Sequence, residues 1–172
     1  MSIRQFEVIG RRKPTETEKE PELYRMRIFV RNHVEAKSSF WNIMRRTKKI
    51  KKTSGETLKC EEIVEAVDLK VKNYGVWFNF IEDSNVTAMY KEFRDVNLNG
   101  AVEQLYNDMA GKHHARFDRI QIVRTTVLKD EECKRPQVIR FHDTKVKFPV
   151  VERKVRRKKE FKKVFEARRP NL

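Results

Sequence analysis

The sequence predicts an α+β fold made of two similar small units, each a short antiparallel sheet with one packed helix, followed by a basic C-terminal extension. Three observations support this prediction. The order strand, strand, helix, strand occurs twice, the apolar residues of the two helices match at one offset along the chain, and positive charge is concentrated near the C-terminus. We expect the first unit at residues 1–72, the second at 73–130 and the extension at 131–172.

The first unit begins with a strand signal at residues 6–9, and residues 11–21 form a charged, proline-bounded connection. In residues 24–30, apolar side chains alternate with arginine, which predicts a half-buried strand with a basic outer side. Apolar residues then follow helical spacing over residues 36–47. After a turn signal, we expect a third strand within residues 56–67.

The second unit shows the same order of elements. Residues 76–81 give an apolar strand signal, residues 83–85 a turn, and residues 86–96 a second strand. The clearest element of the chain is a helix over residues 101–113, which carries one apolar stripe. Residues 120–128 close the unit as its third strand.

The two helices predict an internal repeat. Residues 70–74 form the expected hinge between the units, and Asn97 or Asn99 is available as the N-cap of the second helix. A single offset of 65 positions relates the helix residues Ala36, Phe40, Trp41 and Met44 to Ala101, Leu105, Tyr106 and Met109.

The charge pattern predicts a polyanionic partner. The chain has 40 Lys and Arg against 25 Asp and Glu, a net charge of +15, and residues 134–172 hold 15 of the basic residues but 4 of the acidic ones. Such a field favours nucleic acid or an anionic membrane surface. No run of about 18 apolar residues and no N-terminal secretion signal occur, so we expect a protein that neither spans a membrane nor is secreted.

The sequence contains no arrangement typical of an enzyme. Its 5 glycines form no Gly-rich phosphate loop, and neither GxSxG nor HExxH occurs. Cys60 and Cys133 lack a second cysteine at metal-ligand spacing, so both are interpreted as ordinary thiols. We therefore expect no catalysis, no cofactor, no metal and no small-molecule substrate.

Three short basic clusters are candidate phosphate-binding sites. The densest lies at the end of the first helix, where one or two cations would complement the helix dipole and a larger number indicates phosphate binding. Cations at strand ends and in loops can reach folded RNA through its shape and its phosphates. The clusters consist of Arg45, Arg46, Lys48, Lys49, Lys51 and Lys52; of Arg11, Arg12 and Lys13; and of Lys70 and Lys72.

A fourth candidate site follows the second helix at His113, His114 and Arg116. Adjacent histidines point to different sides of a helix, and no cysteine or carboxylate completes a tetrahedral site, so RNA-facing or solvated histidines are favoured over metal ligands. Aromatic residues in periodic apolar runs are interpreted as core, whereas those among the cations of the extension are expected to insert into crevices of RNA or neighbouring proteins. The core set is Trp41, Trp77, Phe78 and Phe80, and the extension set is Phe141, Phe148, Phe161 and Phe165.

Several segments resemble a known protein family in collinear order over residues 6–150. They are VIGRRKPTE, RMRIF, AKSSFW, KVKNYGVW, MYKEFRDV, AVEQLYNDMA followed by HHARF, and KFP. These segments resemble the eukaryotic large-subunit ribosomal protein family called eighteen-a, or twenty in the unified naming, of which an archaeal relative resembles one half.

The resemblance implies two similar α+β halves in a cytoplasmic ribosomal protein without enzymatic activity. It also implies that the partners are large-subunit ribosomal RNA and neighbouring large-subunit ribosomal proteins. The RNA-facing residues that the resemblance carries over are Arg11, Arg12, Lys13, Lys51, Lys52, Lys70, Lys72, His113, Arg116 and Lys147.

The end of the extension adds further candidate RNA contacts. The run at residues 153–159 also fits a nuclear import signal, which agrees with assembly in the nucleolus. The candidate cations are Arg153, Lys154, Arg156, Arg157, Lys158, Lys159, Lys162 and Lys163.

Two other functions remain open from the residues alone. One is a calmodulin- or membrane-binding regulator, in which residues 40–52 form a basic amphipathic helix with Trp41 as its anchor. The other is an enzyme acting on RNA, such as a nuclease, with His113 and His114 in its site.

Overall fold

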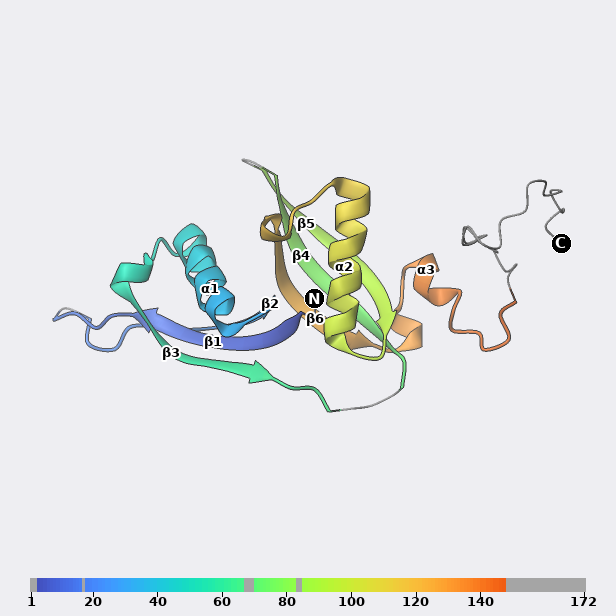
Figure 1. The fold of residues 1–172 in the computed structure, drawn as a ribbon, viewed down its shortest axis with the longest axis horizontal. Coiled ribbons are helices and arrows are strands. Elements are labelled where there is room, and N and C mark those ends of the chain that lie inside the picture. The colour runs from blue at the N-terminus through green and yellow to red at the C-terminus, as the bar shows by residue number, and fades with distance from the viewer. Residues whose placement is uncertain (1–2, 17, 67–69, 83–84, 148–172) are drawn as a thin grey trace, which may run out of the picture. The chain divides into compact units, whose positions relative to one another are not determined.

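The computed structural model describes residues 3–16, 18–66, 70–82 and 85–147. The described chain is α+β and contains two three-stranded antiparallel sheets, each with one long helix packed on it, as the sequence predicts (Figure 1). Residues up to His142 form one compact unit, which we call the folded body.

The first sheet has its first strand in the middle, in the order β2-β1-β3. A single helix covers it, because apolar residues three or four positions apart form a stripe that packs on the inward-facing residues of the strands. The centre of this core consists of Val8, Val30, Ala36, Phe40 and Met44, all at most 2% exposed. The elements are β1 (Arg4–Arg12), β2 (Leu23–Val30), α1 (His33–Thr47), η1 (Lys52–Ser54) and β3 (Gly55–Ile63).

The second sheet has the same arrangement, in the order β5-β4-β6. Its helix buries Leu105 and Met109 against Val76 and Phe78 of the central strand. The elements are β4 (Lys72–Glu82), β5 (Asn85–Asp95), α2 (Leu98–His113), η2 (Phe117–Arg119) and β6 (Ile120–Leu128), followed by η3 (Asp130–Glu132) and α3 (Pro136–Ile139). A third core cluster joins Phe29 of β2 to Tyr74, Leu98, Ala101 and Val102.

The predicted offset of 65 positions extends well beyond the helices. The strand β3 begins at Gly55 and β6 begins at Ile120, while the N-caps of α1 and α2 are Asn32 and Asn97. Each pair differs by 65 positions. The two halves are therefore repeats of one strand-strand-helix-strand unit, and positions in them can be compared one by one.

The strand pairing repeats as well. In the first sheet the register of β1 with β3 shifts between Ile9 and Gly10, and in the second sheet the register of β4 with β6 shifts between Trp77 and Phe78, 68 positions later. Because the central strands differ by 68 positions and the later elements by 65, the hairpin of the second half is three residues shorter. A β-bulge at the same place in both sheets strengthens the repeat relation.

Two expectations about element boundaries are wrong. Residues 72–74 of the expected hinge belong to β4, because Asn73 and Tyr74 pair with β5 and are each 3% exposed. The N-cap of α2 is Asn97, although its side chain makes no capping hydrogen bond, whereas the Oδ1 atom of Asn32 accepts a hydrogen bond from the Glu35 backbone N–H at 2.9 Å. Of the expected turn at residues 83–85, the first two residues lie outside the described chain.

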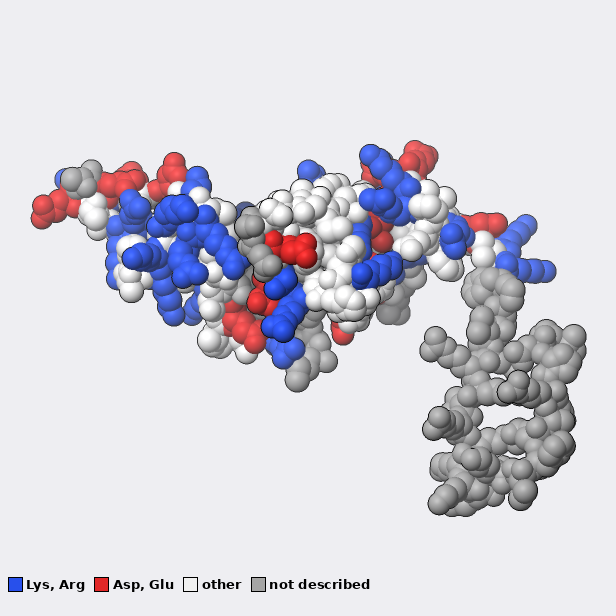
Figure 2. All heavy atoms as spheres, turned by 90° about the horizontal axis from the view of Figure 1, so that it is seen from above, with Lys and Arg blue, Asp and Glu red and all other residues white. Residues whose placement is uncertain are grey.

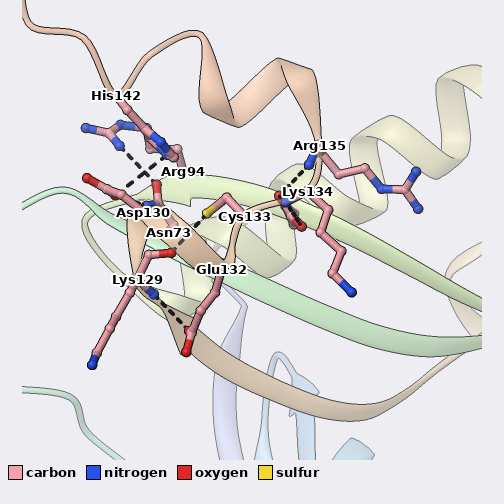
Figure 3. Close-up of polar contacts among 10 residues, drawn as sticks. Asn73, Arg94, Lys129, Asp130, Glu132, Cys133, Lys134, Arg135 and His142 are labelled. Atoms are coloured by element: carbon pink, nitrogen blue, oxygen red, sulfur yellow. Dashed lines mark hydrogen bonds and ion pairs between the residues drawn. The ribbon is translucent and has the colours of Figure 1, made fainter.

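Lys129–His142, which we call the strap, crosses the second sheet (Figure 3). The Asn73 amide donates a hydrogen bond to Asp130 at 2.5 Å, and the strap buries Cys133 and Val138. The first part of the segment expected to be an extension is thus packed on the folded body. Sequence periodicity missed it because only these two buried residues, five positions apart, anchor it.

The carboxylate of Glu92 on β5 holds the middle of the strap. It is 4% exposed and accepts hydrogen bonds from the backbone N–H groups of Lys134 at 2.9 and 3.1 Å and of Arg135 at 2.9 Å. The Tyr90 hydroxyl donates a further hydrogen bond at 2.7 Å. Burial by itself would raise the pKa of Glu92, but these hydrogen bonds outweigh it and lower the pKa below its usual 4.5.

The Glu92→Gln substitution is expected to lower the free energy of unfolding at neutral pH by roughly 2 kcal/mol, since hydrogen bonds to a charged acceptor are lost. Because the pKa of Glu92 is lowered in the folded state, its contribution is complete above about pH 4.5 and is lost as pH falls through the lower folded value. Urea denaturation of both proteins at several pH values would measure this difference. A gap between them that stays constant down to pH about 3 would contradict the assignment.

Candidate nucleic-acid interface

The dense basic cluster forms an exposed loop around one buried anchor. Helix α1 ends at Thr47, Lys49 adopts the left-handed conformation with φ 60°, and the Ile50 N–H donates to the Met44 carbonyl at 3.3 Å. Ile50 is buried at 4% exposure, whereas all six cations around it are exposed. We call residues 45–52 the first basic loop. None of its six cations forms an ion pair with a carboxylate among the residues that the structure describes.

A groove of about 410 Å³ lies beside this loop. Its inner wall is the indole of Trp41, which is 5% exposed and donates a hydrogen bond from Nε1 to the Thr57 hydroxyl at 3.1 Å. Gly55 allows this position, because a Cβ there would overlap the indole ring. The described lining is Ser38, Trp41, Asn42, Arg45, Lys51, Lys52 and Thr53. Cations, hydroxyls and an amide on a shallow surface suit a phosphate group.

Strand pairing brings a second predicted cluster to the same place. Arg12 pairs with Gly55, and the Lys13 backbone N–H donates to the Ser54 carbonyl at 2.9 Å. Arg12 also lines a small pocket of about 150 Å³ together with Lys48, whose ammonium lies 5.6 Å from the centroid of the Tyr24 ring. Figure 2 shows lysine and arginine side chains gathered over the first half of the body. The clusters at residues 11–13 and 45–52 thus form one basic surface.

Two residues of these clusters differ from the rest. Arg11 forms an ion pair with Glu56 at 2.5 Å, so its charge is already matched within the protein. Arg46 lines a separate pocket of about 130 Å³ with Arg27 and Asp118. The remaining cations of the two clusters are better placed to contact a polyanion.

The histidine site is the equivalent of the first basic loop in the second half. Helix α2 ends in the same turn, with His114 at φ 50° and the Ala115 N–H donating to the Met109 carbonyl at 3.3 Å. Ala115 is buried, as Ile50 is. At the offset of 65, Lys48, Lys49 and Lys51 correspond to His113, His114 and Arg116, which are all exposed. We call residues 113–116 the second basic loop.

The other candidates stand apart from these loops. Lys70 and Lys72 lie at the start of β4, where Lys72 pairs with Asp95, and neither is a described lining residue of the groove. Lys147 is exposed at the end of the described chain, and Phe141 is 48% exposed. The remaining predicted residues lie outside the described chain: Phe148, Arg153, Lys154, Arg156, Arg157, Lys158, Lys159, Phe161, Lys162, Lys163 and Phe165.

The sequence analysis missed the neutral part of the groove. Ser38, Asn42 and Arg45 are spaced by four and three positions, which places them on one face of α1, and this polar stripe was the available signal. Trp41, Phe78 and Phe80 are buried as predicted, but the expectation that Trp77 belongs to the core is wrong. Alternation along β4 puts Trp77 on the face opposite Val76 and Phe78, which α2 does not cover.

The described residues give no support to metal or membrane chemistry. Among them, no group of three or more His, Cys, Asp or Glu side chains is arranged to hold a metal ion. Cys60 and Cys133 are free, and burial raises the pKa of the Cys133 thiol. No helix in the described ranges has the length and apolar character needed to cross a bilayer.

Comparison with known proteins agrees with this surface. Residues 3–126 match the family model of the ribosomal proteins 50S-L18Ae and 60S-L20, a range that spans both halves. The chain is 45% identical over 151 residues to the large ribosomal subunit protein eL20 of Spodoptera frugiperda, and the match covers 88% of this chain and 85% of that relative.

Proposed function

This chain belongs to the family of ribosomal proteins that includes 50S-L18Ae and 60S-L20, and on this premise we propose that it binds ribosomal RNA through phosphate contacts. As a structural constituent of the large ribosomal subunit, it also contacts neighbouring ribosomal proteins in the proposed arrangement. No reaction is proposed. Assembly in the nucleolus, with import through residues 153–159, completes the proposal and rests on the sequence alone.

The observation that carries the proposal is the exposed charge of the first basic loop beside the groove, which no described carboxylate pairs. A folded polyanion that contacts these cations releases its condensed counterions, and this release drives association. Lysine and arginine near the ends of strands and helices reach phosphates without reading bases, which suits a protein that recognises RNA by shape. The second basic loop offers a similar, less charged contact in the other half.

The regulator alternative is disfavoured by the packing of α1. Phe40 and Trp41, which would have to face calmodulin or a membrane, are 0% and 5% exposed in the core of the first half. Exposing them would require α1 to leave its sheet. The nuclease alternative has no supporting geometry, because His113 and His114 lie on an exposed turn without a described nucleophile or acid beside them.

A salt titration of the full chain with large-subunit ribosomal RNA fragments tests the proposal. If Arg12, Lys13 and four cations of the first basic loop each neutralise one phosphate, the logarithm of the association constant is expected to fall with that of the salt concentration with a slope of roughly −5. Filter binding or fluorescence anisotropy would measure it. An affinity that stays flat between low and moderate salt would defeat the phosphate mechanism.

A further inference from the structure

The face of the second sheet opposite α2 carries aromatic side chains. Trp77 lies in the middle of the central strand β4 and is half-buried. Its neighbours along the strand, Val76 and Phe78, point to the other face and pack against α2. The indole therefore lies on a surface that α2 does not cover.

Four planar side chains form a row across this face. The Arg124 guanidinium of β6 lies 5.5 Å from the centroid of the Trp77 ring, and Trp77 packs on Tyr90 of β5 with ring centroids 4.7 Å apart. The Arg135 guanidinium of the strap lies 5.7 Å from the centroid of the Tyr90 ring and donates a hydrogen bond to the Tyr90 carbonyl at 3.0 Å. We call Arg124, Trp77, Tyr90 and Arg135 the aromatic ladder.

The net charge of the ladder is positive. The carboxylate two positions along the same face of β5, that of Glu92, is 4% exposed and is occupied by the strap and by the Tyr90 hydroxyl. Because that hydroxyl is bound inward, Tyr90 can offer its ring rather than its hydroxyl to a partner. Gly75 leaves room for Tyr90, since a Cβ there would lie 3.2 Å from the hydroxyl oxygen.

The described part of the first sheet has no such row, although its fold is the same. The equivalents of Trp77, Tyr90 and Arg124 are Ile9, Arg25 and Lys59, at the offsets of 68, 65 and 65 positions. Of these, Arg25 forms an ion pair with Glu7 at 2.5 Å and Lys59 forms one with Glu61 at 2.8 Å. The fold therefore does not require aromatic residues here, and the ladder is a property of the second half alone.

We propose that the aromatic ladder binds unpaired nucleotides of RNA, with bases stacking on Trp77 and Tyr90 and phosphates contacting Arg124 and Arg135. This inference rests on the proposed function and adds a second mode of RNA contact to it. Aromatic rings on an open antiparallel sheet stack on splayed-out bases, and flanking guanidinium groups bind the backbone. Base-paired RNA has no free base face for this surface, so the ladder distinguishes single strands from duplexes.

Fluorescence of the full chain tests the ladder with two probes, a short oligouridylate and an RNA duplex of the same length. The chain has 2 tryptophans, so the signal lost in the Trp77→Phe variant reports on Trp77. We expect the oligouridylate to quench this signal and the Trp77→Ala variant to bind it roughly 10- to 100-fold more weakly. The Trp77→Phe variant should retain most of the affinity, and duplex binding should change little in either variant.

The exposed Arg124→Gln variant provides a second readout that does not alter packing of the rings in a core. It is expected to weaken oligouridylate binding several-fold and to reduce the salt dependence by about one phosphate contact. Unchanged oligouridylate affinity in both Trp77→Ala and Arg124→Gln, while both probes still bind with steep salt dependence, would overturn the ladder but leave the proposed function intact. Absence of salt-dependent binding to either probe would overturn both.

Discussion

Replacing Lys48, Lys49, Lys51 and Lys52 together by glutamine is expected to weaken binding of the full chain to large-subunit ribosomal RNA by roughly 100- to 1000-fold near physiological salt. Each of these cations is exposed and lacks a carboxylate partner in the described part of the chain, so each is free to neutralise a phosphate. The salt slope should fall by about four contacts' worth. Titrations at several salt concentrations would measure both quantities.

A matched variant separates position from total charge. The Arg4, Arg25, Lys59 and Lys112 side chains are also exposed, but they are paired with Glu62, Glu7, Glu61 and Asp108. Replacing these four by glutamine changes the net charge equally and should cost at most about tenfold in affinity, through the long-range field. Equal losses in the two variants would show that the basic loop is no specific site.

The Phe40→Ala substitution is expected to lower the free energy of unfolding by about 3–5 kcal/mol. Phe40 is fully buried in the core of the first half, and its ring packs edge-on against Trp41 with centroids 5.0 Å apart. Truncation leaves a cavity between α1 and the sheet that rigid strands close only in part. Urea denaturation followed by circular dichroism would measure the change.

The exposed face of the same helix supplies the control. Val34 is 62% exposed, so the Val34→Ala substitution removes little packing and should change the free energy of unfolding by no more than about 0.5 kcal/mol. A Phe40→Ala effect as small as this would mean that α1 is not held on its sheet by the buried stripe.

The local elements could be predicted from the sequence because they are periodic. The alternation at residues 24–30 and the helical stripe at 101–113 each arise from a side chain that faces one core, and β6 has the predicted bounds Ile120–Leu128. The repeat was visible because both helices bury residues at the same positions. Periodicity also indicates the two faces of a strand, but not which face a helix covers, and this is why Trp77 was misplaced.

The candidate site was only partly predictable for a related reason. The cations of both loops stand out in the sequence, yet the ion pair of Arg11 joins residues 45 positions apart and exists only once β1 pairs with β3. The same pairing brings Lys13 to Ser54 and merges two clusters. The strap is held through the backbone N–H groups of Lys134 and Arg135, which every residue except proline carries, so no side-chain pattern marks it.

Lys49 and His114 are the two non-glycine residues with positive φ in the described chain. Glycine would adopt this conformation with less steric cost, by about 1 kcal/mol. Both halves thus tolerate a less stable backbone where a side chain projects from the end of a helix. Selection for folding alone would favour glycine at these two turns, so their retained side chains point to a demand that the isolated chain does not itself impose.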